Sequence, residues 1–395
     1  MSSLPVIRPE EAGFSAERLA RIGAVFREHV ERRRLAGAVF LLSRYGKIAH
    51  LEAVGARDPV SGDPMRADAV FRCYSMTKPV VSVMAMMLAE RGQLLLTDPV
   101  SKYIPAYAGV KVGVVRDGRM QLEEPRREIT VHDLLRHTSG LSYEFLAAPE
   151  LQKLYMDAKI FRRNWTSMEH AEALAKLPLN SHPGEQWDYG RSTDVLGAIV
   201  EVITGQSLGE ALQDNIFGPL GMTDTGFCVR PEALDRLAEP LPVHPLTGAP
   251  VKLLDVTKPY PFESGGGGLV STAMDYARFI QMLQNGGALG PARLLSRKTV
   301  AFMTADHLPP GARVGSDLLP PGHGFGLGFA VRAAPGLSPT PGSVGQYFWS
   351  GIAGTTFWVD PQEEFFALLM IQVPPELREE YRLLFRNLAY AAFAD

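Results

Sequence analysis

The chain is poor in features that mark several large classes of protein. Only two of its 395 residues are cysteines, and Cys73 and Cys228 belong to no CxxC pair and no metal-ligand cluster. A disulfide framework or a zinc ribbon is therefore not expected. The net charge of −3 provides neither the basic surface that binds nucleic acid nor a strongly acidic tail. We expect no metal, no cofactor and no nucleic-acid partner.

Long apolar runs are also missing. The first eleven residues lack a cationic start followed by an apolar segment, so no signal peptide is visible. The longest strongly apolar helical stretch, 79–90, is too short to cross a bilayer. The sequence thus predicts a cytoplasmic protein without a membrane span, whose partners are small solutes. No oligomeric state follows from it.

Both ends of the chain carry strand patterns. A helix capped by Ser15 is expected first, followed by strands at 37–42 and 48–54 with a turn between them. Near the other end, four strands are expected at 325–331, 346–349, 355–359 and 365–373. A final helix is expected at 375–393. Because the connections are too short for crossover helices, these strands predict one antiparallel sheet.

The middle of the chain has a helical and loop-rich pattern. Helices are expected at 76–91, 131–136, 168–176, 194–204 and 208–216. A capping-box sequence at 166–169 marks the start of one of them. The predicted fold is therefore α+β, an antiparallel sheet flanked by helices with an inserted, mainly helical lobe. Residues 1–71 and 266–395 are assigned to the sheet lobe and 72–265 to the insertion.

The most informative motif is Ser75-Met76-Thr77-Lys78. Residues three apart share a helix face, so an unprotonated Lys78 could take the proton of Ser75, as in serine acyl-transfer enzymes that need no histidine. The following helix is apolar nearly all round, which predicts burial and places Ser75 at its positive end. About half a Ser-x-x-Lys match is expected by chance, so the context decides. The alternative is that Ser75 caps the helix and Lys78 is a solvated charge.

The context is a series of five segments in a fixed order. They are 73–78 (CYSMTK), 134–141 (LLRHTSGL), 183–190 (PGEQWDYG), 219–222 (PLGM) and 267–272 (GGLVST). In this order the sequence resembles the serine β-lactamase-like superfamily, in its class C-related branch, the family VIII carboxylesterases. The resemblance covers nearly the whole chain and implies one β-lactamase-related domain.

The resemblance assigns roles to particular residues. It implies that Ser75 is the nucleophile and that Lys78 and Tyr189, from a Tyr-x-Asn-type motif, exchange protons with it as one coupled base. It implies an oxyanion hole made by the backbone N–H groups of Ser75 and Ile352. Lys78 would then need a pKa about 2 to 3 units below its usual value, which burial of the helix is expected to provide.

Two departures from the family pattern bear on the substrate. The segment Trp349-Ser350-Gly351 takes the place of a Lys-Thr-Gly strand that lines the site, and Trp349 cannot form the charge-assisted bond that holds a penicillin carboxylate. Arg191 replaces the Asn of Tyr-x-Asn; it could attract an acidic substrate, or be a surface or salt-bridged arginine. Both polar handles for penicillins are missing, which favours ester substrates.

Other candidate motifs have structural interpretations. The Gly-x-Ser-x-Gly match at 205–209 falls between two expected helices, so Ser207 is interpreted as a helix cap and not as a nucleophile. His132 and His137 are not in His-Glu-x-x-His form, and the segment starting at His137 is interpreted as a turn. The glycines at 265–268 are ascribed to close packing, and 324–328 to a strand with tight approaches.

The sequence therefore predicts a serine carboxylesterase that acts on small or short-chain acyl esters. An acyltransferase with the same acyl-enzyme is one alternative, and a β-lactamase is another. The non-enzymatic alternative is a binding protein that keeps the fold without the chemistry.

Overall fold

The computed structural model describes residues 4–116, 119–315 and 318–395. Residues 1–3, which belong to the N-terminal segment without a visible signal peptide, lie outside the described residues. The architecture is an antiparallel sheet with helices, as the sequence predicted, so the α+β class is confirmed. The proposed boundaries at 71/72 and 265/266 stay a prediction.

An eight-stranded sheet runs through the molecule in the order β12-β13-β14-β15-β16-β1-β2-β3. Its strands are β1 (Gly37–Arg44), β2 (Lys47–Asp58), β3 (Asp63–Pro64), β12 (His323–Phe325), β13 (Ala330–Arg332), β14 (Tyr347–Ser350), β15 (Thr356–Asp360) and β16 (Phe365–Ile371). The central pair joins the two ends of the chain, with Ala38 of β1 opposite Ile371 of β16. The predicted sheet built from both termini is confirmed.

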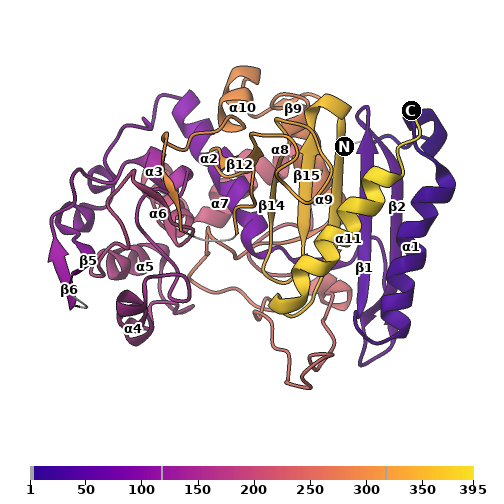
Figure 1. The fold of residues 1–395 in the computed structure, drawn as a ribbon, viewed down its shortest axis with the longest axis horizontal. Helices are drawn as coiled ribbons and strands as arrows, with labels where there is room; N and C mark the ends of the chain where they lie inside the picture. Colours follow the sequence, from indigo (N-terminus) through magenta and orange to yellow (C-terminus); the bar gives the residue numbers. More distant parts are fainter. Residues whose placement is uncertain (1–3, 117–118, 316–317) are drawn as a thin grey trace.

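Helices cover both faces of the sheet centre, where β1 and β16 are buried at every position. On one face, α1 (Ala16–Glu31) packs beside α11 (Arg378–Ala391), and Phe26 contacts Phe40 of β1. On the other face, α9 (Ala273–Gln284) places Tyr276 against Phe357 of β15. Ser15 caps α1 as predicted, because its side chain accepts from the Arg18 N–H. Figure 1 shows α1 and α11 next to the sheet.

The inserted segment lies at the opposite end of the molecule from α1 (Figure 1). Its helices are α2 (Thr77–Glu90), α3 (Val131–Leu135), α4 (Pro149–Ala158), α5 (Ser167–Leu174), α6 (Ser192–Thr204), α7 (Leu208–Leu212) and α8 (Gly218–Leu220). The capping box at Thr166 and Glu169 is present at the start of α5. The sequence patterns missed α4 and the hairpin of β5 (Val112–Arg116) and β6 (Arg119–Glu123).

The expected strand at 325–331 is wrong, because this stretch forms two strands joined by a tight turn. β12 and β13 pair antiparallel, and the Gly326 N–H donates to the Phe329 carbonyl at 2.7 Å. A Cβ at Gly326 would collide with the Met303 carbonyl, and Gly328 has a φ of +97° that favours glycine. The glycines therefore make a turn here where the alternating pattern suggested one continuous strand.

Short elements complete the structure. They are the strands β4 (Val70–Arg72), β7 (Gln186–Trp187), β8 (Val270–Thr272), β9 (Ala288–Leu289), β10 (Ala292–Arg293) and β11 (Arg313–Val314), and the helix α10 (Arg297–Met303). Both cysteines are free. In the described ranges, no single helix is long and apolar enough to span a bilayer, and one sharply bent pair, 192–204 with 208–220, meets that test on length and composition only.

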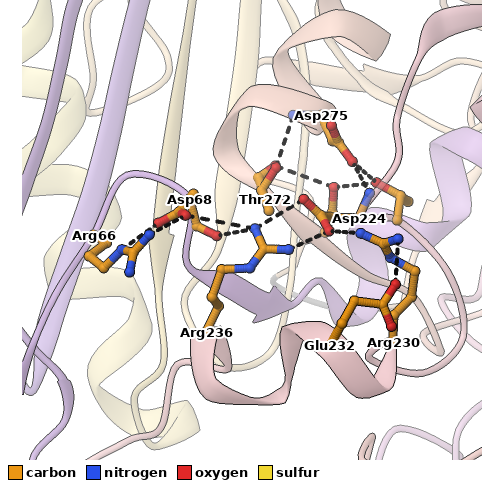
Figure 2. A network of polar contacts seen from close by, with 10 residues as sticks. Arg66, Asp68, Asp224, Arg230, Glu232, Arg236, Thr272 and Asp275 are labelled. Atoms are coloured by element: carbon orange, nitrogen blue, oxygen red, sulfur yellow. Dashed lines mark hydrogen bonds and ion pairs between the residues drawn. The ribbon is translucent and has the colours of Figure 1, made fainter.

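An ion-pair network secures the strand that leads to Ser75 (Figure 2). Arg236 donates to an Asp224 carboxylate oxygen at 3.0 Å and to the Asp68 carbonyl at 3.0 Å, just before β4. The Asp224 N–H donates to Asp275 at 2.7 Å, in the first turn of α9. Since β4 pairs with β8, which runs into α9, these contacts fix the approach of the chain to the α2 N-terminus.

Candidate active site

Ser75 lies in a 3-10 turn, Tyr74–Met76, between β4 and the buried helix α2. The preceding Cys73 is anchored by its N–H to the Leu269 carbonyl at 2.8 Å. Tyr74 has a left-handed φ of +46°, and its hydroxyl accepts from the Leu254 N–H at 2.9 Å. The chain therefore turns sharply here and presents the Ser75 hydroxyl to a cavity at the helix N-terminus. Ser75 is not the N-cap, which is Met76.

Lys78 is buried, with 1% of its surface exposed, and its amine contacts three acceptors. Nζ donates to the Gly266 carbonyl at 2.6 Å, to the Tyr143 hydroxyl at 3.0 Å and to Ser75 Oγ at 3.3 Å. The alternative of a solvated first-turn charge is thus wrong. Three acceptors match the three N–H donors of an ammonium group.

The expectation of a lowered Lys78 pKa is wrong, because the pKa is raised. Burial alone lowers the pKa of this amine, but the phenolic oxygens of Tyr143 and Tyr189 together outweigh that effect. Conversely, burial raises the pKa of Tyr143 to about 12, although Lys78 opposes the shift. The Lys78 amine and the Tyr143 phenol therefore influence each other's pKa across their direct contact.

Tyr189 is brought to the same place by contacts that the sequence did not reveal. The Asp188 N–H donates to the His137 carbonyl at 2.8 Å, which joins the 183–190 segment to the turn after α3. The Tyr189 ring centroid then lies 4.6 Å from Lys78 Nζ. Its hydroxyl accepts from Trp349 Nε1 at 3.3 Å. The structure thus gathers Ser75, Lys78, Tyr189 and Trp349, as expected.

The end of β14 approaches the Ser75 turn at Gly351. A Cβ on this residue would collide with the Cys73 carbonyl oxygen and with Thr355 Oγ1, so only glycine fits. Thr355 Oγ1 itself donates to the Cys73 carbonyl at 3.2 Å. The next residue, Ile352, borders the cavity, and its N–H has no acceptor within the described chain. A free N–H beside the serine turn is the geometry expected of an oxyanion-hole donor.

Tyr143 is a residue of the site that sequence reasoning missed. It contacts Lys78 directly, and its ring packs against Tyr189 with centroids 5.5 Å apart. The only signal in the sequence was its place two residues after the 134–141 motif. A contact between residues 65 positions apart leaves no local periodicity to detect.

Arg191 is salt-bridged, which was one of the two alternatives for it. Its side chain is buried and donates to both Glu144 carboxylate oxygens, at 3.0 and 2.8 Å, with Asp194 3.8 Å away. Its guanidinium also lies over the Tyr143 ring, 5.0 Å from the centroid. Arg191 therefore has its charge balanced and supports Tyr143.

These residues line one cavity of about 900 Å³. Its lining includes Ser75, Tyr143, Tyr189, the 349–352 segment and the α11 arginines. This volume suits a small organic molecule. In the described residues, no group of three histidine, cysteine or acidic side chains is placed to hold a metal ion.

The motifs at 205–209, 137–140 and 265–268 have the structural roles that the sequence suggested, whereas 324–328 holds the end of β12 and part of the turn to β13. Ser207 is the N-cap of α7 and forms a capping box with Glu210, so the Gly-x-Ser-x-Gly interpretation as a nucleophile elbow is disfavoured. His137 occupies a turn with a φ of +57°, and its buried ring lies beside Tyr189. Gly265 and Gly266 pack closely on Thr193 and Asp194.

The sheet is antiparallel and built from both chain ends, and a serine lies in the turn just before a buried helix whose first turn carries a lysine. This combination defines the β-lactamase/transpeptidase-like class of serine hydrolase. The chain belongs to the Beta-lactamase family, whose model matches residues 22–391.

Individual relatives refine this assignment. Esterase EstB of Burkholderia gladioli is 34% identical over 364 residues, which cover 88% of each chain. Monacolin J acid methylbutanoyltransferase of Aspergillus terreus is 32% identical over 247 residues, 58% of this chain and 57% of that protein. The solved structure of EstCE1, described as a hydrolase with promiscuous acyltransferase activity, matches with a TM-score of 0.79 and 27% identity, over 94% of this chain and 98% of that one. The predicted resemblance to family VIII esterases is confirmed.

Proposed function

We propose that this serine hydrolase is a carboxylesterase that cleaves small or short-chain acyl esters through an acyl-enzyme on Ser75. The observation that carries the proposal is the 3.3 Å contact between Ser75 Oγ and Lys78 Nζ at the wall of the cavity. The similarity to an esterase over most of the chain supports it.

In the first step, Ser75 Oγ attacks the carbonyl carbon of the ester, and its proton passes to the coupled group. We assign the role of proton carrier in that group to Tyr189, with Lys78 as its partner, because Lys78 Nζ lies 3.3 Å from Ser75 Oγ and 4.6 Å from the Tyr189 ring centroid. The carbonyl oxygen becomes an oxyanion that accepts from the N–H groups of Ser75 and Ile352, and each such donor contributes about 3 to 4 kcal/mol to the transition state.

In the second step, the bond to the alcohol breaks, and Tyr189 returns the proton to the leaving oxygen. A water molecule then attacks the acyl-enzyme by the same route and releases the acid. Trp349, Ser350 and Gly351 form the wall along which the substrate lies. Trp349 also orients Tyr189 through its indole N–H.

The test compares two serine variants. Ser75→Ala should keep the fold and lose turnover of p-nitrophenyl butyrate, whereas Ser207→Ala should keep most activity and lose some stability, because Ser207 only caps α7. Intact mass should show one phosphonate adduct on the wild type and none on Ser75→Ala. Full activity of Ser75→Ala would exclude the proposal, and the absence of any adduct on the wild type would favour a non-catalytic binding protein.

Acyl transfer is the second candidate, because relatives with both activities are similar to this chain. An acyl-enzyme on Ser75 can be released by an alcohol or amine in place of water. Adding alcohol acceptors to the esterase reaction and measuring the transfer product against the free acid separates the two functions.

A further inference from the structure

One wall of the active-site cavity is a face of α11 that carries three arginines. Arg378, Arg382 and Arg386 are spaced four residues apart, so they point to the same side of the helix, and all three line the cavity. The wall has a single acidic side chain, Glu379. It therefore carries more positive than negative charge.

Arg386 is buried without a direct ion pair among the described residues, although Glu379 and Asp360 act on its charge at longer range. Only 8% of its surface is exposed, and its guanidinium lies over Phe348 and Trp358, 4.9 Å from each ring centroid. Its one hydrogen bond is long, from Nη1 to Gln346 Oε1 at 3.3 Å. No carboxylate in the described part of the chain forms an ion pair with it. Burial lowers the pKa of Arg386 to about 10. A buried charge in this condition is unfavourable until an anion joins it.

Arg382 connects this wall to the reacting centre. It donates to the Gly351 carbonyl, next to the proposed oxyanion donor Ile352, and contacts Glu379 at 3.3 Å. Its Nε is buried and has no hydrogen-bond partner. One helical turn separates Arg382 from Arg386, so Arg386 lies about 6 Å farther along the wall.

Arg191 provides the contrast within the same cavity. It is equally buried, but Glu144 binds it through both carboxylate oxygens and Asp194 lies nearby. Arg191 is thus neutralised by a carboxylate in direct contact, whereas Glu379 and Asp360 act on Arg386 only at longer range. This difference distinguishes a structural arginine from one that is available to a ligand.

We propose that Arg386, assisted by Arg382, binds a carboxylate at the far end of the acyl group, so that the preferred substrates are monoesters of dicarboxylic acids. The inference rests on the proposed esterase function, because it names the substrate of that site. A guanidinium recognises a carboxylate by two parallel hydrogen bonds, and here the ring faces of Phe348 and Trp358 hold the guanidinium flat. The charge-assisted bond to a substrate carboxylate, which Trp349 cannot form, is then formed by arginines of α11.

The kinetic test compares monoethyl adipate with ethyl hexanoate, a neutral ester of equal acyl length, by ethanol release. The wild type should have a kcat/KM for monoethyl adipate at least tenfold higher, mainly through KM, and Arg386→Met should abolish that preference by bringing the kcat/KM values of the two esters together. Arg386→Lys should keep part of it. Equal kcat/KM values for the two esters in the wild type would overturn the inference.

A substitution that is expected to strengthen substrate binding controls for effects caused by loss of structure. Glu379→Gln removes the one negative charge of the wall, so it should lower the KM for monoethyl adipate by several-fold. The neighbouring Glu380→Gln, whose carboxylate pairs with Arg34 just after α1, should leave that KM unchanged. An unchanged or raised KM in Glu379→Gln would contradict the inference even if Arg386→Met fails to fold.

A binding measurement separates the inference from the esterase proposal. Calorimetry on Ser75→Ala should detect adipate binding that the uncharged adipamide and chloride do not reproduce, and Arg386→Met in the same background should lose it. If adipate binds but no ester is hydrolysed by the wild type, the esterase function fails and the carboxylate site stands. If esters are hydrolysed but adipate binds no better than chloride, the carboxylate site is wrong.

Discussion

Lys78 Nζ lies 3.0 Å from the Tyr143 hydroxyl, so the lysine of the Ser-x-x-Lys motif is shared between its serine and a tyrosine 65 residues away. The same amine lies near the Tyr189 ring. The candidate catalytic group is therefore one serine, one lysine and two phenols, and the two tyrosines can be separated by substitution.

Tyr143→Phe should lower kcat for p-nitrophenyl butyrate by about tenfold, because a hydrogen bond to a charged group contributes about 1.5 to 3 kcal/mol. Tyr189→Phe should cost more, since it removes the proposed proton carrier. Steady-state kinetics of both variants tests this order. Tyr103→Phe, whose hydroxyl donates to Asp98 outside the site, is the matched control and should keep full activity.

Trp349→Phe should lower kcat by about tenfold and leave thermal stability nearly unchanged. The substitution keeps an aromatic ring beside Tyr189 but removes the indole N–H that donates to its hydroxyl. A net neutral hydrogen bond contributes about 1 kcal/mol, which corresponds to a factor of about five to ten. A variant with unchanged kcat would show that this bond does not orient Tyr189.

Gly351→Ala should reduce kcat by about a hundredfold, because a Cβ collides with the Cys73 carbonyl and displaces the Ile352 N–H. The control is Gly109→Ala, where a Cβ meets no atom within 4 Å. Circular dichroism should show both variants folded. If Gly351→Ala retained wild-type kcat, Ile352 would not be an oxyanion-hole donor.

Nitrocefin should be a poor substrate, with a kcat/KM below that for p-nitrophenyl butyrate. Arg191, at the position of the family's asparagine, is already committed to Glu144, and Trp349 replaces the lysine of Lys-Thr-Gly. A kcat/KM for nitrocefin above that for every simple ester tested would favour the β-lactamase alternative.

The free energy of unfolding should fall as pH falls from about 6.5 to about 4, with His132 as one cause. Burial, Arg136 and His307 lower the pKa of this imidazole to about 4. The unfolded chain takes up a proton on His132 near pH 6.5 and the folded chain near pH 4, so protons favour unfolding in that window. Urea denaturation of His132→Gln should show a shallower pH dependence. An identical slope in the wild type and the variant would exclude His132 as a contributor.

The sequence predicted those parts of the structure that depend on neighbours in the chain. The Ser75–Lys78 contact is an i,i+3 relation, and the caps at Ser15, Thr166 and Ser207 act within one helical turn. Such features can be predicted from residues that are close together in the sequence.

The features that were missed depend on segments distant in sequence. The turn inside 325–331 exists because the Met303 carbonyl comes close to Gly326, and no pattern of side chains records that approach. The Lys78 pKa was expected to fall because burial was anticipated and the contact with Tyr143 was not. Tyr143 and Arg386 could not be assigned to the site from the sequence, because they come from distant segments that both line the cavity only in the folded protein.

The pairing of β1 with β16 sets a constraint on how the protein is made. β1 emerges early in synthesis and can form a hairpin with β2, but its other edge has no partner until β16 has been translated. For most of that time an apolar strand edge is open to pairing with other chains. The same delay applies to the reacting groups, because Ser75 is synthesised long before Trp349 and Ile352. A ribosome-bound fragment that ends before β14 is therefore expected to be inactive and prone to aggregation, and recombinant yield should depend on slow translation or on chaperones that protect this edge.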